Sequence, residues 1–443
     1  MAVNRRQVVV GTGAAGLGFT LSGAVSSVFA GTASAATPKK FTGYGELVPD
    51  PKGLVDLPPG FRYTVLSRAG VDSLTGGGAV PGAPDGTYAF PLGPGRSVLV
   101  RNHELSPGGT DLVPQRPGIT YDPAASGGTT TVTVAGDRLL SAVPSLAGTI
   151  RNCAGGNTPW RTWLSCEETE ETPTTNPALT KRHGYVFEVD PFGRLRDREA
   201  VPLTALGRFA HEAVAVDPQS GCLYLTEDAS KPYGLIYRFL PRKPLGGPGS
   251  LRAGGKLQAL QVPGVPDLSA VSALHTTVRL SWVDVPDPDA ATVSTRKQFA
   301  AGKVTQVPKA EGIFWSGRSA YVVSSYAKTA DGAARDHAGQ VWKLDPKRGT
   351  LELVLLIEPG GRFDGPDNIT VSPNGGIVLC EDGDGEQYLI APSAEGVPYP
   401  LARNAVSDSE WTGATFSADG RWLYSNIQSD GLTVAITGPW WRG

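Results

Sequence analysis

One short pattern recurs along the sequence, and it constrains the fold more than any other feature. Each copy has an apolar segment of strand length, a turn rich in Pro, Asp, Ser or Gly, and a second apolar segment; the clearest copies span 211–228, 367–382 and 411–426. Short segments joined by such turns are typical of β-hairpins. Looser copies end near residues 104, 168 and 325. The sequence therefore predicts six hairpins.

A second kind of hairpin lies between these copies. Residues 185–193 and 340–349 each carry an apolar segment that turns at Asp-Pro. Two hairpins per repeat make a four-stranded unit, so six repeats predict an all-β fold, a six-bladed β-propeller. We expect residues 36–443 to form this single β-propeller domain, with the long stretch between Asp228 and Ser325 as an insertion on a blade. Two stacked β-sandwiches are the alternative, but they would not explain six similar hairpins.

Composition supports a large β protein and argues against other classes. Of the 443 residues, 57 are Gly and 37 are Pro, and both residues weaken helix interiors. Hydrophobic residues make up 40% of the chain, and nine residues are Trp, which argues against disorder. The net charge of −2 gives little electrostatic support for nucleic-acid binding.

The first 35 residues resemble an export signal rather than a part of the fold. Arg5-Arg6 opens them, no charged residue follows until Lys39, and Ala33-Ser34-Ala35 precedes a predicted cleavage before Ala36. Paired arginines before a weakly apolar segment are typical of a twin-arginine signal peptide. We therefore expect the twin-arginine export machinery to recognise residues 1–35, and we expect a secreted or periplasmic location. A membrane anchor is the alternative, although it would favour a more apolar segment.

Acidic residues gather where the predicted hairpins begin and end. In a propeller, equivalent strand ends from several blades converge around the axis, so these side chains would meet at a central metal site. Carboxylates that share a site raise one another's pKa, and a bound cation reverses that effect. Carboxylate and amide oxygens are typical calcium ligands, whereas a Cys thiolate favours a transition metal. The candidate metal ligands are Cys166, Glu167, Glu212, Glu227, Asp228, Glu311, Asp364, Asp367, Asn368, Glu381 and Asp382.

Several of these residues also have ordinary structural interpretations. An acidic pair such as Glu227-Asp228, taken alone, is more often a solvated strand end than a ligand pair. A lone Cys166 is more often a buried apolar residue than a ligand. The thiols of Cys153 and Cys222 are interpreted as packing groups. Repetition of acids across the blades favours the functional interpretation.

Longer motifs make the interpretation more specific. They lie at residues 158–168, 208–217, 310–312, 366–368, 379–383 and 435–440. Together they resemble the PhoX family of secreted alkaline phosphatases. The resemblance implies a six-bladed propeller whose central site holds ferric iron, Fe(III), and calcium, Ca2+, and it implies hydrolysis of phosphate monoesters, with diesters for some members.

The same resemblance assigns roles by motif match. Cys166 would be the thiolate ligand of iron, and Glu212, Glu311 and Asp367 would supply carboxylates to the metal cluster. The resemblance assigns calcium ligation, or contact with the ligands, to four further acids, which are Glu227, Asp228, Glu381 and Asp382.

One position departs from the family pattern. An arginine is expected two positions before Glu311, and Lys309 stands there instead. Lysine neutralises phosphate as a point charge, without the two-pronged hydrogen bonding of arginine. The resemblance makes Lys309 the catalytic and substrate-binding side chain, with a lysine in place of the arginine. The reaction that it implies is metal-assisted hydrolysis, which needs no side-chain nucleophile.

Two other functions remain open on the sequence alone. A calcium-dependent propeller lactonase or esterase would use similar carboxylates at the axis but would not need Cys166. A non-catalytic binding propeller would tolerate loss of the acids. We expect small-molecule phosphate esters as substrates and a monomeric protein. Metal analysis separates the three functions, since iron with calcium favours the phosphatase, calcium alone the lactonase, and neither the binding propeller.

Overall fold

The computed structural model describes residues 43–195, 199–325, 337–373, 375–393 and 396–440. Residues 1–35, the predicted signal peptide, lie outside the described residues. The regular secondary structure of the described part is almost entirely β-strand, with four 3₁₀ helices: η1 (Thr204–Leu206), η2 (Ser250–Ala253), η3 (Leu268–Ala270) and η4 (Thr295–Lys297). No helix among the described residues has the length and apolar character needed to cross a membrane.

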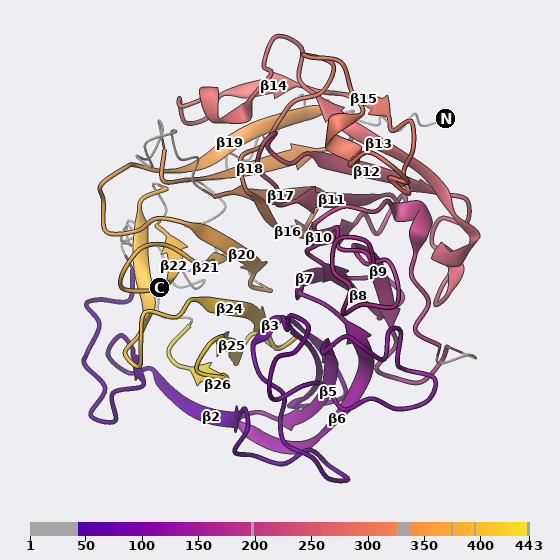
Figure 1. Cartoon of the computed structure of the whole chain (residues 1–443). Helices are drawn as coiled ribbons and strands as arrows, with labels where there is room; N and C mark the ends of the chain where they lie inside the picture. Colours follow the sequence, from indigo (N-terminus) through magenta and orange to yellow (C-terminus); the bar gives the residue numbers. More distant parts are fainter. Residues whose placement is uncertain (1–42, 196–198, 326–336, 374, 394–395, 441–443) are drawn as a thin grey trace, which may run out of the picture.

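The strands form six antiparallel sheets arranged as blades around a central axis (Figure 1). Each blade begins with an innermost strand beside the axis. In blade order the innermost strands are β3 (Pro84–Pro91), β7 (Asn152–Asn157), β10 (His211–Val216), β16 (Ala310–Ser316), β20 (Pro366–Val371) and β24 (Trp411–Phe416). The fold is therefore the predicted six-bladed β-propeller.

A second strand pairs with each innermost strand to make the six predicted hairpins. These second strands are β4 (Arg96–His103), β8 (Trp163–Glu167), β11 (Leu223–Glu227), β17 (Ser319–Ser324), β21 (Ile377–Glu381) and β25 (Leu423–Ile427). The outer strands, from blade 1 to blade 6, are β5 (Gly127–Ala135) and β6 (Arg138–Thr149) in blade 1, β9 (Val186–Val189) in blade 2, β12 (Ile236–Pro241) and β13 (Gly255–Gln261) in blade 3, β18 (Gly339–Asp345) and β19 (Thr350–Ile357) in blade 4, β22 (Tyr388–Pro392) and β23 (Pro398–Asn404) in blade 5, and β26 (Leu432–Thr437) in blade 6. Blade 2 has three strands among the described residues, β7, β8 and β9.

The N-terminal strands close the ring. β2 (Arg62–Arg68) pairs with β26 as the outermost strand of blade 6, and β1 (Val55–Asp56) pairs with β23 at the edge of blade 5. Blade 6 is thus built from both ends of the chain, so the ring closes through backbone hydrogen bonds between segments far apart in sequence.

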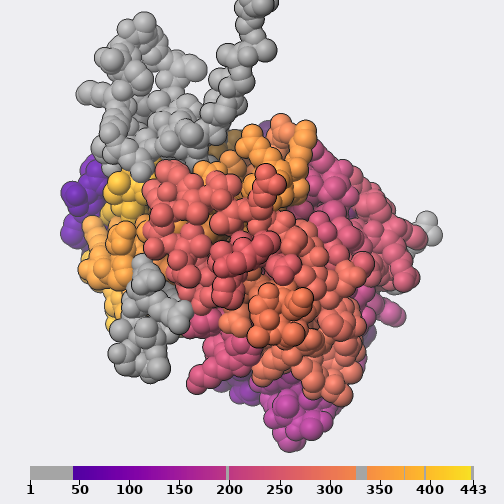
Figure 2. Space-filling model, turned by 90° about the horizontal axis from the view of Figure 1, so that it is seen from above, coloured from indigo at the N-terminus to yellow at the C-terminus, as the bar shows by residue number. Residues whose placement is uncertain are grey.

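The stretch between Asp228 and Ser325 is only partly an insertion, because it also contains β12 and β13 of blade 3 and β16 and β17 of blade 4. The added segment is the connection between β13 and β16. Its short strands β14 (Thr277–Arg279) and β15 (Ser281–Asp284) pair with β19 of blade 4 and β13 of blade 3 respectively. In Figure 2 salmon-coloured atoms of this part of the chain lie at the centre of the face in view. The insertion therefore extends two existing sheets rather than forming another domain.

Hydrophobic side chains fill the space between each pair of neighbouring blades. One cluster joins Leu164 of blade 2 to Val214 of blade 3, and the next joins Tyr224 of blade 3 to Val322 of blade 4. Four further clusters occupy the remaining junctions around the ring. Because both faces of each sheet are covered, strands such as Leu223–Glu227 are buried along their whole length.

The innermost strands approach one another so closely that only glycine fits at several positions near their beginnings. A Cβ on Gly86 would lie 2.5 Å from Cα of Ala154 in the next blade, and a Cβ on Gly413 would lie 2.4 Å from the carbonyl oxygen of Asp85. Gly413 also has a φ of +60°, which glycine adopts without strain. The axial cavity that these strands line measures about 40 Å³, so the inner ends of the blades hold the axis nearly closed.

Candidate metal centre

All six blades end their inner hairpin in the same way. The first residue of each innermost strand pairs with the last residue of the second strand. The register of the two strands then shifts within two or three residues in every blade. The residue that follows the second strand donates its backbone N–H to the carbonyl one residue before the innermost strand, as in Glu168 to Arg151 at 2.9 Å and Asp382 to Gly365 at 2.8 Å. This shared backbone arrangement brings equivalent side chains of six blades to one end of the axis.

Two sets of side chains meet at this end. The second residues of the innermost strands are Asp85, Cys153, Glu212, Glu311, Asp367 and Thr412. The residues that directly follow the second strands are Glu104, Glu168, Asp228, Ser325, Asp382 and Gln428. Both sets are predominantly acidic because the sequence repeats acids at the same place in successive hairpins.

Members of these sets, together with Glu410, which directly precedes β24, form three groups of potential ligand atoms, and the atoms of each group lie within 4.8 Å of one another. The groups are Cys153 with Glu168 and Glu212, Glu212 with Glu311 and Asp367, and Asp367 with Asp382 and Glu410. Glu212 and Asp367 each belong to two groups. The three groups therefore form one continuous assembly, which we call the axial acid cluster.

Burial and mutual repulsion disfavour the ionised forms in this cluster. Burial, with the carboxylates of Asp367 and Glu311, raises the pKa of Glu212 well above its usual range. Burial raises the pKa of Asp367 to about 7, and the charge of Asp382 adds to that shift. Burial, followed by Glu212 and Glu168, also raises the pKa of the Cys153 thiol. Among the described residues, Oε1 of Glu212 and Oδ1 of Asp85 are buried without a hydrogen-bond partner.

These features fit bound cations. Buried oxygens without donors and carboxylates that repel one another are both satisfied by a positive ion between them. The donors are mainly carboxylate oxygens, which hard cations prefer, with one thiol, which softer transition metals prefer.

Two cationic side chains lie at the edge of the axial acid cluster. Nζ of Lys309 is 3.1 Å from Oε1 of Glu311 and 4.0 Å from Oδ2 of Asp382, and the Glu311 carboxylate is the main cause that raises the pKa of Lys309. Nε of Arg151 is 3.3 Å from Oε1 of Glu104, and its Nη2 pairs with Glu168.

Several residues predicted from the sequence come together here. Glu212, Glu311, Asp367 and Asp382 are members of the axial acid cluster. Asp228 joins its edge through a hydrogen bond with Glu168.

Asn368 touches the cluster in a different way. Its Nδ2 donates to Oδ1 of Asp367 at 2.7 Å, and its Oδ1 accepts from the backbone N–H of Gly413 at 2.7 Å. Asn368 therefore orients Asp367 and ties blade 5 to blade 6.

Other predicted residues lie elsewhere. Glu167, Glu227 and Glu381 turn into their own blades, where each accepts one or two backbone N–H groups at or just before the start of the third strand. Glu167 also contacts Nδ1 of His183 at 2.6 Å. The structure therefore places the second member of each acidic pair at the axis, because successive side chains of a strand point in opposite directions.

Asp364 lies beside one of these inward-turned acids rather than in an axial group. Its backbone N–H donates to Oε1 of Glu381 at 2.7 Å, and its Oδ1 accepts from the backbone N–H of Asp384 at 3.2 Å. These contacts anchor the loop after β21.

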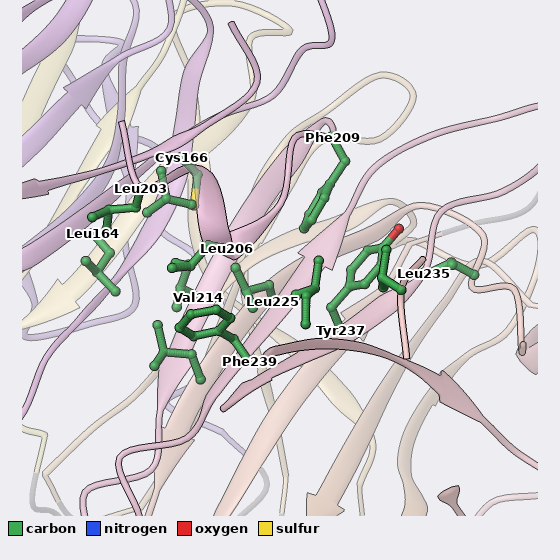
Figure 3. Close-up of a cluster of buried hydrophobic side chains, with 14 of the residues drawn as sticks. Leu164, Cys166, Leu203, Leu206, Phe209, Val214, Leu225, Leu235, Tyr237 and Phe239 are labelled. Carbon is green, nitrogen blue, oxygen red and sulfur yellow. The ribbon is translucent and has the colours of Figure 1, made fainter. Parts of the chain in front are cut away.

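Cys166 is also placed away from the axis, and this corrects its expected position. Figure 3 shows Cys166 among Leu164, Leu203 and Leu206 in the hydrophobic cluster between blades 2 and 3. Leu164 and Cys166 are two residues apart in β8, so both side chains point into this cluster. Burial raises the pKa of the Cys166 thiol well above its usual range.

Cys153 takes the position that had been expected for Cys166. It was interpreted as a packing residue, but it is the second residue of β7 and belongs to the axial acid cluster with Glu168 and Glu212. Its Sγ lies 3.3 Å from the carbonyl oxygen of His211 in the next blade.

Sequence reasoning also missed other axial residues. Asp85, Glu104, Glu168 and Glu410 were not among the predicted ligands, although each occupies a repeated hairpin position or adjoins one. Superposing the hairpins at their second residue would have found Asp85 and Cys153, since both stand where Glu212, Glu311 and Asp367 stand in other blades.

Comparisons with known proteins identify a family and similar folds. A family model described as alkaline phosphatase PhoX matches residues 42–144 and 135–431. The solved structure of Pseudomonas fluorescens PhoX, in complex with vanadate as a transition state analogue, is similar with a TM-score of 0.65 and 18% identity, and the match covers 87% of this chain and 96% of that chain. A search of curated proteins found no match.

Two other solved structures are more distant. A protein of unknown function from Dyadobacter fermentans has a TM-score of 0.46 and 10% identity, with 86% of this chain and 99% of that chain covered. A Xanthomonas campestris gluconolactonase has a TM-score of 0.38 and 12% identity, with 85% of this chain and 99% of that chain covered.

Proposed function

The chain belongs to the alkaline phosphatase PhoX family, and on that premise we propose that it is a metal-dependent phosphatase that hydrolyses phosphate monoesters at the axial acid cluster. The observation that carries this proposal is the sharing of Glu212 and Asp367 among three groups of potential ligands. Such sharing would hold several cations close together, as a cluster that binds one phosphate group requires.

The donor set supports iron and calcium as the cations. Cys153, Glu168 and Glu212 would hold iron, because this group contains the thiol and thiolates favour transition metals. Glu311, Asp367, Asp382 and Glu410 would supply the oxygen ligands that calcium prefers. Bound cations would supply Lewis acidity to the phosphate oxygens.

The chain's own side chains would bind and orient the substrate. Lys309 is 31% exposed, so its ammonium group can reach a phosphate oxygen while Glu311 holds it in place. Asn368 keeps Asp367 oriented toward the cluster. Because the cavity along the axis is only about 40 Å³, substrate would enter and product would leave at the acid end.

Metal content and hydrolysis test the proposal together. We expect the purified protein to contain iron and calcium and to hydrolyse p-nitrophenyl phosphate, with loss of activity after chelation. The Glu212→Gln variant should lose cations and activity. The control is Glu188→Gln, which should retain both, because Glu188 lies on the outer strand β9 and its carboxylate accepts a hydrogen bond from Trp160. Calcium alone with lactone hydrolysis would establish the lactonase instead, and a protein without cations or hydrolysis would contradict the phosphatase. Assays with bis(p-nitrophenyl) phosphate decide whether diesters are also substrates.

We also propose export by the twin-arginine machinery and a secreted or periplasmic, monomeric protein. The paired Arg5-Arg6 supports the export route. Changing both residues to Lys should block export, and unchanged secretion of the double variant would contradict it. Size-exclusion chromatography with light scattering measures the oligomeric state.

A further inference from the structure

One residue directly precedes the innermost strand of each blade, and two of these six residues have cationic side chains. These positions are Ala83, Arg151, Ala210, Lys309, Gly365 and Glu410. Arg151 and Lys309 are therefore equivalents in blades 2 and 4. Their backbones match as well, since the carbonyl of each accepts a 2.9 Å hydrogen bond from the residue after its second strand, Glu168 or Ser325.

Arg151 and Lys309 share a left-handed backbone conformation that belongs to this hairpin position. Their φ angles are 48° and 41°, and Ala83 and Gly365, which hold the same position in blades 1 and 5, have φ angles of 41° and 52°. The conformation therefore comes with the hairpin, and Arg151 and Lys309 differ from the other members of the position by their long cationic side chains.

Both cations face the axial acid cluster and remain accessible. The Arg151 side chain is 41% exposed and pairs with Glu104 and Glu168. The Lys309 side chain is 31% exposed and pairs with Glu311. The two acids that they contact are linked, because Glu168 and Glu311 each belong to a group of potential ligands that contains Glu212. Arg151 and Lys309 therefore reach the same acid cluster from blades 2 and 4.

We propose that Arg151 is a second phosphate-binding residue, which contacts oxygens of the phosphoryl group together with Lys309. This inference rests on the phosphatase function proposed above. A guanidinium has five N–H donors, so Arg151 can keep its contacts with Glu104 and Glu168 and still present donors to a phosphate. Arginine forms paired hydrogen bonds with phosphate, whereas lysine acts as a point charge. Arg151 therefore supplies the two-pronged recognition that Lys309 lacks.

A simpler role for Arg151 makes a different prediction. If Arg151 only neutralises Glu104 and Glu168, its loss should change the metal content or the stability, and phosphate affinity should change only as a consequence of those. If Arg151 binds phosphate, affinity should fall in protein that keeps its full metal content.

The experiment compares the metal-loaded wild type with Arg151→Gln, Arg151→Lys and Arg194→Gln. Arg194 is a matched control, because it is 40% exposed and pairs with Asp190 at 2.9 Å on an outer loop. Isothermal titration with inorganic phosphate measures the dissociation constant, mass spectrometry measures metals in the same samples, and p-nitrophenyl phosphate kinetics give KM and kcat.

Binding by Arg151 predicts weaker phosphate affinity in Arg151→Gln by about 10-fold to 100-fold, the usual effect of a lost charged hydrogen bond. KM should rise in parallel, Arg151→Lys should show an intermediate loss, and Arg194→Gln should match the wild type. Wild-type phosphate affinity in a fully metal-loaded Arg151→Gln protein would overturn the inference.

If Arg151→Gln loses metal, Arg151→Lys decides, since it keeps the charge. Weaker phosphate binding at full metal content supports the inference, and wild-type affinity overturns it. Failure of the proposed function looks different, because the wild type itself would then neither bind phosphate nor hydrolyse any phosphate ester.

Discussion

Cys153 and Cys166 offer a matched test of the site, because both are buried thiols in neighbouring strands of blade 2. We expect Cys153→Ala to lose most of its iron and its phosphatase activity, since the structure places this thiol with Glu168 and Glu212. We expect Cys166→Ala to keep both, since its side chain packs against leucines between blades 2 and 3.

The effect on folding should be small and similar for the two variants. Each substitution deletes one sulfur atom from a buried site, which costs about 1 kcal/mol by analogy with the loss of one buried methylene or methyl group. Unfolding entropy of about 2 cal/mol/K per residue makes this a shift of only about 1 °C in Tm for a chain of this length. A large difference in iron content with a small, equal change in Tm therefore identifies the ligand.

The assay combines mass spectrometry of iron and calcium with calorimetry of metal-free protein, because bound cations add to the apparent stability. Cys153→Ser is a further control that nearly keeps the side-chain volume while replacing the sulfur. Full iron content in Cys153→Ala together with loss of iron in Cys166→Ala would refute the strand register on which the site is built.

Two further predictions test the packing and the electrostatics of the axis. Gly312→Ala should destabilise the protein by about 2 kcal/mol or more, because the added Cβ would lie 2.7 Å from the carbonyl oxygen of Asp367. Gly109→Ala is the control, since the nearest atom to its added Cβ would be 3.4 Å away. Equal unfolding midpoints of the two variants in urea would contradict the close approach at Gly312. Burial raises the pKa of Asp367 to about 7, so the folded state retains a proton that the unfolded chain releases above about pH 4. Metal-free protein should therefore lose stability as pH rises from about 4 to about 7, added calcium should restore it, and denaturation curves that show rising stability over this interval would contradict the direction of the shift.

Much of the fold could be predicted from the sequence because each blade is a local unit. Hairpins join segments that are adjacent in the chain, and their turns carry Gly, Pro, Asp and Ser at recognisable positions. The repetition of acids at hairpin ends also indicated where the site would lie. Neither inference needed knowledge of contacts between distant residues.

Individual site residues were less predictable, because they depend on which way each side chain points. Glu167 and Glu168 are adjacent and chemically identical, yet Glu167 binds backbone N–H groups inside blade 2 and Glu168 joins Cys153 at the axis. A shift of one residue moves a side chain to the opposite face of a strand. The register shift near the start of every inner hairpin makes that choice hard to derive from sequence.

The sequence by itself thus determined the number of blades, the all-β class and the end of the axis at which acids gather, because these follow from local pattern. Only the tertiary structure decided that the side chain of Cys166 packs between blades 2 and 3, and that Arg151 contacts Glu104 and Glu168 at the axis. Both facts arise when six separate strand ends converge on one axis, where the alternation of side chains and the position of each bulge select the residues that meet.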